Sequence, residues 1–201
     1  MKFHEHKIKF GKEKTFACAD CGRKIDLSKL VIGSGKRGFD NYVNLDLVNF
    51  PKVDILHNLD KYPWPFPDNT FSEIYASHII EHLDVEQAMK EIHRICKNDA
   101  LVKIMVPHHS NPFKRLSHRY EGFNLETFTN HFYKGSIYCD VNFKQLKAKF
   151  MIRVSRQFMK AEKCKFFNWI INKKNFQRIY ERFFCYMLPS AEIQYLLKVV
   201  K

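Results

Sequence analysis

The chain has 201 residues, of which 45% are apolar and 15% aromatic, and this composition excludes a disordered or low-complexity protein. Its apolar runs fall short of the roughly 20 residues that span a bilayer. The first residues lack the apolar stretch of a secretory signal, which favours a cytoplasmic location. The formal charge of +13 is gathered at the two ends of the chain, around an acidic middle. Such ends could attract RNA, phospholipid or a phosphorylated sugar, or could equally be a solvated basic surface.

Short apolar runs that stop at turns predict five strands, at residues 30–32, 42–46, 53–56, 71–76 and 101–106. Three prolines within 63–68 exclude regular structure there. Asp84, with Gln87 three residues later, has the pattern of a capping box, and apolar side chains at helical spacing follow as far as Cys96. Strands that alternate with helical segments predict a parallel sheet covered on both faces.

The C-terminal part of the chain has a different composition. Residues 161–188 are rich in aromatic and basic side chains and read as helix, ending before Pro189. Alternating apolar residues over 193–199 predict a final strand, an antiparallel partner at the sheet edge. We therefore expect a basic leader over 1–28 and one domain over 29–201, with a lid or cap helix at 160–188 and the last strand at 190–201.

The aromatic stripe within this tail has two interpretations. It is formed by Phe166, Phe167, Trp169, Ile170, Phe183 and Phe184. The favoured interpretation is core packing or a lid over a ligand crevice, because most apolar helix faces are buried. The alternative is peripheral membrane contact through 161–188, or a site for an acyl or prenyl substrate.

A glycine-rich turn follows the first strand. Residues 33–38, Gly-Ser-Gly-Lys-Arg-Gly, match the dinucleotide fingerprint, but Asp46 follows Gly35 by only eleven residues. This interval holds a turn and a strand, so it has no room for the helix whose N-terminus would bind a pyrophosphate. The spacing favours a nucleoside ligand without phosphates. The ribose hydroxyls of this ligand would bond the Asp46 carboxylate. The glycines would let the protein backbone approach the ligand closely.

Several segments together resemble the class I S-adenosylmethionine-dependent methyltransferases, in particular the small-molecule type with a shortened first helix. They are Leu30–Gly35, Asn44–Asp46, Asn58–Asp60, Pro63–Phe71, Ala76–Leu83 and Met89–Lys97. The likeness runs from about residue 29 to 132, and the final segment from Tyr180 is also similar. The resemblance implies a Rossmann-like, mostly parallel seven-stranded α/β sheet with an antiparallel last strand, an enzyme, and S-adenosyl-L-methionine as its cofactor.

The resemblance also implies the cofactor contacts. Gly33, Ser34 and Gly35 would contact the methionine end. Asp46, followed by Leu47, would hold the ribose. The adenine would lie between Asn58 and Leu59, and the sulfonium beside Ser77 and His78. One departure is Val31, which stands where the family commonly has a polar or acidic residue.

The candidate catalytic residues are His118, His78 and His82. His118 ranks first because it stands where the family has a substrate-side histidine, and imidazole is a suitable base if the acceptor must lose a proton. Residues 78–82, His-Ile-Ile-Glu-His, also have the spacing of an inverted zinc-protease helix. They resemble as well a metal-binding Glu-x-x-Glu-His of quinone-pathway O-methyltransferases. The favoured alternative is that Glu81 and His82 bond loop backbone, and we predict no metal.

His108 and His109 also follow the fifth predicted strand, where open α/β sheets place their ligand crevice. Cys18 and Cys21 could form half of a zinc site with His4 and His6, although two free thiols are favoured.

The sequence thus predicts methyl transfer to O or N of a small acceptor, which could be anionic or lipid-linked. The alternatives are an RNA-modifying or RNA-binding protein on the same fold, and a catalytically inactive methyltransferase-like scaffold. The sequence does not determine the oligomeric state.

Overall fold

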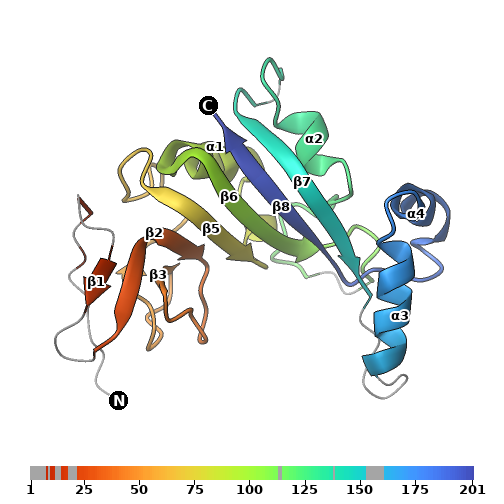
Figure 1. Ribbon diagram of the computed structural model, residues 1–201, viewed down its shortest axis with the longest axis horizontal. Helices are drawn as coiled ribbons and strands as arrows, with labels where there is room; N and C mark the ends of the chain where they lie inside the picture. Colours follow the sequence, from red (N-terminus) through yellow and green to blue (C-terminus); the bar gives the residue numbers. More distant parts are fainter. Residues whose placement is uncertain are drawn as a thin grey trace.

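A single mixed sheet organises the chain. The computed structural model describes residues 8, 10, 11, 15–17, 22–112, 115–137, 139–152 and 161–201, with side chains from 165 in the last range. Its eight strands have the order β4-β3-β2-β5-β6-β8-β7, with β1 paired to β2 beside this path (Figure 1). The strands are β1 (Thr15–Ala17), β2 (Lys24–Ile32), β3 (Tyr42–Asp46), β4 (Ile55–Leu56), β5 (Phe71–Ser77), β6 (Cys96–Pro107), β7 (Asn142–Met151) and β8 (Glu192–Val200).

The directions of the strands confirm the predicted fold class. Neighbours from β4 to β6 are parallel, whereas β8 is antiparallel to both β6 and β7. The last strand is therefore antiparallel, as predicted, but its placement at the edge is wrong, because β8 lies between β6 and β7. The edge strand β7 is missing from the prediction. Its register shifts between Gln145 and Lys147, and this irregularity breaks the period-two pattern that would have revealed it.

The helices are short, and most of them lie in the second half of the chain. They are the 3-10 turn η1 (Ile80–His82), α1 (Val85–Ile95), α2 (Thr127–His131), α3 (Ala161–Ile171), α4 (Phe176–Ile179) and the π-helical turn η2 (Tyr180–Phe184). The predicted cap of α1 is confirmed, since the Asp84 carboxylate accepts the Gln87 N–H at 3.0 Å. The single helix predicted over 161–188 is wrong, because α3 ends at Ile171 and the chain turns before α4 begins.

Amide side chains from α3 and the turn after it complete the edge of β7. Asn172 accepts the Phe150 N–H at 2.8 Å and donates to the Phe150 carbonyl at 2.8 Å. Asn168 makes the same pair of bonds with Ile152. These amides occupy the backbone groups that a further strand would use, so the helix is fixed against an edge that would otherwise be open.

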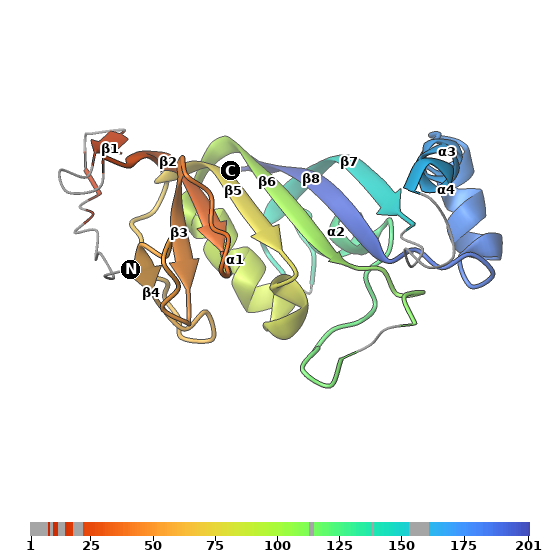
Figure 2. The ribbon, with the colours of Figure 1, turned by 90° about the horizontal axis from the view of Figure 1, so that it is seen from below.

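Helices cover only one face of the sheet in the described part of the chain. Figure 2 shows α1 and α2 on the same side of the strands. The connections over 33–41 and 47–54 contain turns but no helix. Each is shorter than the dozen or so residues that a helical crossover between parallel strands needs. On the opposite face Tyr75, Lys103 and Leu196 are paired across three strands and line a hollow of about 240 Å³. The expectation of cover on both faces is therefore wrong.

The hydrophobic core lies between the sheet, α1 and the loops on the covered face. At the N-terminal side, β2 begins at Lys24, inside the predicted leader, and Arg23 just before it binds the fully buried Asp54 carboxylate at 2.8 Å. In the described part of the chain no helix is both long and apolar enough to cross a bilayer.

Candidate active site

A tight turn follows β2, and its two glycines have different surroundings. Gly33 and Gly35 have φ values of 64° and 59°, a left-handed region that side chains disfavour. A Cβ on Gly33 would lie 2.7 Å from Cγ1 of Ile79, so this position is packed shut. A Cβ on Gly35 would meet nothing within 4 Å. The turn is therefore tight on one side and open on the other, at the carboxyl end of β2.

The carboxylate of Asp46 lies beside this turn, at the end of the neighbouring strand β3. Its Oδ2 accepts the Gly35 N–H at 2.8 Å, and its Oδ1 accepts the Val48 N–H at 2.9 Å. These two backbone bonds fix the side chain, while a carboxylate still has further lone pairs for hydroxyl donors. Gly35 and Asp46, which the sequence analysis paired by spacing, are thus in direct contact.

Ser34 provides a second polar group in the same turn. Its hydroxyl oxygen is buried and has no hydrogen-bond partner, although such groups are nearly always paired in folded proteins. An unpaired hydroxyl between two glycines, next to a carboxylate, fits a polar ligand at this turn. The amino-acid end and the ribose of S-adenosylmethionine have donors and acceptors for both groups.

His78 lies at the end of β5, between two buried carboxylates. Its Nε2 is 3.1 Å from Glu192 Oε2, and its Nδ1 is 3.4 Å from Glu81 Oε1. Hydrogen bonding to Glu192 and then to Glu81 raises the pKa of His78 to about 9. Its φ of 53° is also in the left-handed region, a strain that concentrates at functional sites. His78 is therefore held as an imidazolium at neutral pH.

His82, the last residue of η1, contacts His118, and the centroids of the two rings are 4.9 Å apart. The Nδ1 of His82 is 3.0 Å from the Ser117 carbonyl, which fixes the loop that carries His118 against η1. The same loop is bound from the other side, because Arg119 makes a two-pronged ion pair with Asp60 at 2.8 and 3.0 Å. The structure thus brings His82 and His118 together, near the loop after β4.

The remaining predicted cofactor residues occupy varied positions. The Leu47 side chain is exposed, whereas Leu59 is buried in the core with its carbonyl bound to the Trp64 indole N–H at 3.0 Å. Asn58 accepts the Asp60 N–H at 3.0 Å and shapes the loop. Ser77 Oγ is 3.7 Å from Met105 Sδ. The side chain and the carbonyl of Leu59 are therefore both engaged within the protein.

His108 and His109 directly follow β6, and both are in contact with neighbouring side chains. His108 is buried between Ser110 Oγ at 2.8 Å and Glu181 Oε1 at 3.1 Å. Burial lowers its pKa, and the bond to Glu181 works in the opposite direction. His109 Nε2 is 3.7 Å from the Cys185 sulfur.

Two groups in the described residues have donors close enough to share a metal ion, with ligand atoms within 4.8 Å of one another. They are Glu81, His82 and His118, and His108, His109 and Glu181. The proposed half zinc site at Cys18 and Cys21, with His4 and His6, lies outside the described residues.

Glu192 is the site residue that sequence reasoning missed. It is the first residue of β8 and 114 positions from its partner His78. The alternation of the last strand gives no signal for it, because the apolar residues 193, 195, 197 and 199 share one face and Glu192, although buried, is out of phase with them.

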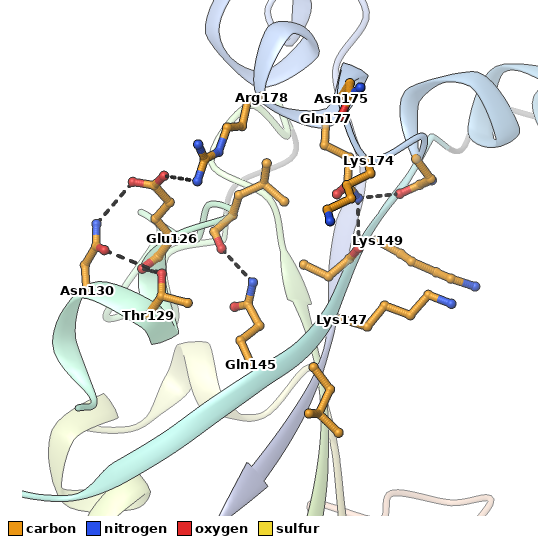
Figure 3. Close-up of a pocket in the computed structure, with 14 residues that line it drawn as sticks. Glu126, Thr129, Asn130, Gln145, Lys147, Lys149, Lys174, Asn175, Gln177 and Arg178 are labelled. Carbon is orange, nitrogen blue, oxygen red and sulfur yellow. Dashed lines mark hydrogen bonds and ion pairs between the residues drawn. The ribbon is translucent and has the colours of Figure 1, made fainter. Parts of the chain in front are cut away.

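A separate groove of about 900 Å³ lies against the outer edge of β7, between α2 and the turn before α4 (Figure 3). Its lining is mixed: it includes the basic side chains of Lys147, Lys149, Lys174 and Arg178, together with Gln145, Glu126 and Leu146. None of its lining residues belongs to the glycine turn, Asp46 or the histidine cluster. The groove is therefore distinct from the candidate active site.

The chain is similar to known proteins in sequence and in structure. Residues 24–104 match the family described as a methyltransferase domain. The structure is similar to a SAM-dependent methyltransferase from Archaeoglobus fulgidus, with 16% identity, a TM-score of 0.50, and 85% of each chain covered. It is also similar to MccD protein, with 14% identity, a TM-score of 0.50, and 87% of this chain and 90% of that chain covered. A methyltransferase from Mesorhizobium loti matches with 12% identity, a TM-score of 0.47, and 86% and 90% covered. No curated protein matches the sequence.

The strand order and the antiparallel last strand define the class I methyltransferase fold. The match over residues 24–104 together with this fold indicates an S-adenosylmethionine-dependent methyltransferase, with S-adenosylmethionine as the methyl donor.

Proposed function

We propose that this methyltransferase acts on an oxygen or nitrogen atom of a small acceptor that is anionic or lipid-linked, in the cytoplasm. The donor site in this proposal rests on one observation above others. The Asp46 carboxylate is fixed beside the open side of a glycine turn, with the unpaired Ser34 hydroxyl in the same turn. When bound, S-adenosylmethionine supplies an electrophilic methyl group on a sulfonium. In this proposal Asp46 takes the ribose hydroxyls, and Gly33, Ser34 and Gly35 hold the methionine end.

The cluster around His78 lies beside the proposed position of the sulfonium. His78 is an imidazolium, and it lies between the carboxyl groups of Glu81 and Glu192. The two carboxyl groups are buried, and carboxyl oxygens near the end of β5 face the region where a cationic sulfonium would bind in this proposal. Because His78 keeps its proton at neutral pH, we assign it a positioning role and not that of a base.

His118 is the proposed base for an acceptor that must lose a proton, with His82 at its side. The His118 side chain is held near Glu121, with Nδ1 3.7 Å from Oε1. As the bond from the acceptor atom to the methyl carbon forms, the bond from the methyl carbon to sulfur breaks, and the acceptor proton passes to the imidazole. Most of the acceleration comes from holding the two reacting groups in line.

Binding of S-adenosylhomocysteine tests the donor site. The free energy of unfolding should rise by about 2.7 kcal/mol at 100 times the Kd. Asp46→Asn should weaken this binding at least tenfold. Asp40→Asn is the matched control, because Asp40 is an exposed carboxylate that pairs with Lys52 at 2.7 Å. Equal binding by the two variants would remove Asp46 from the site.

Transfer of a labelled methyl group tests the acceptor class. We expect label in acidic or lipid-soluble metabolites of a cell extract. His118→Gln should lower kcat about 10²- to 10⁴-fold while S-adenosylhomocysteine binding is unchanged. Label in RNA alone would favour the RNA-modifying alternative. Donor binding without transfer to any fraction would favour the inactive scaffold.

A further inference from the structure

The end of the molecule beyond β7 exposes an unusual number of large apolar side chains. We define the aromatic-basic surface as Phe166, Trp169, Lys173, Lys174, Ile179, Arg182, Phe183, Tyr186 and Met187. Its rings and its methionine are 59 to 81% exposed, from Phe166 at 59% and Trp169 at 60% to Phe183 at 65%, Tyr186 at 76% and Met187 at 81%. The expected core packing of this stripe is therefore wrong, since large apolar side chains so exposed mark an interaction site.

The anchoring of α3 explains why these rings point outward. Asn168 and Asn172 bind the edge of β7, so they fix the inner side of the helix. Phe166 and Trp169 lie on the outer side and stack on each other, with centroids 6.2 Å apart. After α4, the buried Tyr180 and Cys185 hold η2 to the core, while Phe183, Tyr186 and Met187 face solvent.

Cations are interleaved with the rings. The Lys173 amine lies 3.9 Å from the centroid of the Trp169 ring, and the Arg182 guanidinium lies 5.7 Å from that of Phe183. Glu181 is the sole acidic residue between 165 and 188. Its Oε1 is turned inward, where it accepts the Leu125 N–H at 2.9 Å and contacts His108. Over residues 165–188 the exposed charged side chains are therefore all cationic, and the one carboxylate is 17% exposed.

We propose that the aromatic-basic surface docks onto an anionic phospholipid bilayer. Exposed aromatic side chains beside lysines and arginines match the two layers of such a membrane surface, since the rings enter the interface and the cations meet the headgroups. A second copy of the chain fits less well, because two such surfaces would bring like charges together.

One edge of the docking surface contacts the segment that follows β6. The Tyr186 ring is 5.7 Å from His109 at the end of β6. A few residues later the chain reaches Glu192, which binds His78. The inference stands on the surface alone, and it holds whatever the acceptor proves to be.

Vesicle binding by the full chain tests the proposal. The chain has two tryptophans, and Trp64 is buried at 1% exposure, so a change in emission on binding reports on Trp169. With vesicles of 70% phosphatidylcholine and 30% phosphatidylglycerol we expect co-sedimentation, a blue shift of emission, and quenching by brominated lipid. Binding should fall with added salt and be weak on pure phosphatidylcholine. Failure to bind the anionic vesicles at millimolar lipid would overturn the proposal.

Variants test whether vesicle binding depends on this surface or is nonspecific. Trp169→Ser with Phe183→Ser should weaken vesicle binding about tenfold or more, and Lys173→Glu with Arg182→Glu should do the same. The control is Ile137→Ser, which removes an apolar side chain of 88% exposure outside the surface and should bind as the parent does. All variants should keep S-adenosylhomocysteine binding, which reports the proposed function separately. A concentration-dependent dimer that the double variants abolish, or tighter binding to single-stranded RNA than to vesicles, would assign the surface to another partner and refute the proposal.

Discussion

The two glycines of the turn after β2 offer a matched pair of substitutions. Alanine at either position must adopt a left-handed conformation, which costs roughly 1–2 kcal/mol. At Gly33 the new Cβ would also lie 2.7 and 2.8 Å from Cγ1 and Cβ of Ile79, and overpacking of this kind adds roughly 1–3 kcal/mol. Gly33→Ala should therefore lower the free energy of unfolding by about 2–5 kcal/mol, and Gly35→Ala by only about 1–2 kcal/mol.

Urea unfolding, with the slope checked for constancy, measures these two losses. S-adenosylhomocysteine titration should show the reverse order. A Cβ at Gly35 would enter the open space beside Asp46, so Gly35→Ala should keep most stability and lose donor affinity. Equal stability losses, or full donor affinity in Gly35→Ala, would refute the assignment of one glycine to packing and the other to the ligand.

Three further outcomes are expected. The pKa of His78 rises from 6.5 in the unfolded chain to about 9 in the fold. Its contribution to the free energy of unfolding is therefore complete below about pH 6.5 and is lost as the pH rises through 9. Urea titrations of His78→Gln should lack this loss, and a pH profile like that of the parent would contradict the prediction. Arg23→Met should cost about 3–5 kcal/mol because it removes the guanidinium that binds the buried Asp54 carboxylate at 2.8 Å, and thermal unfolding within 1 kcal/mol of the parent would count against this. Asn172→Leu should cost about 1–3 kcal/mol and speed hydrogen exchange at Phe150, whose N–H it leaves unpaired, whereas unaltered exchange would show that water replaces the amide.

Local patterns predicted those parts of the fold that depend on local chemistry. The cap at Asp84, the absence of a helix between Gly35 and Asp46, and the contact between these two residues all follow from spacing along a short segment. The approach of Glu192 to His78 joins residues far apart in the chain, and periodicity carries no information about such pairs. The strained φ of His78 likewise appears only in the structure.

The aromatic tail shows a different limit of sequence reasoning. Helical spacing indicates which side chains share a face, but it does not indicate whether another element covers that face. Trp169 and Phe183 have the pattern of core residues and are exposed. The reason is that Asn168 and Asn172 bind the sheet edge through their amides, so the polar side of α3 faces inward. This reversal of the usual orientation has no signature in hydrophobicity alone.

The sheet that carries helices on only one side should tolerate change unevenly along its central strands. In β6, Val102, Ile104 and Val106 are fully or almost fully buried, whereas the exposed Lys103 alternates with them. In saturation mutagenesis of this strand, tolerance to substitution should alternate from one residue to the next, with permissive exposed positions between intolerant buried ones. A sheet covered on both sides would resist substitution at every step, so natural variation should collect on the bare side of this enzyme.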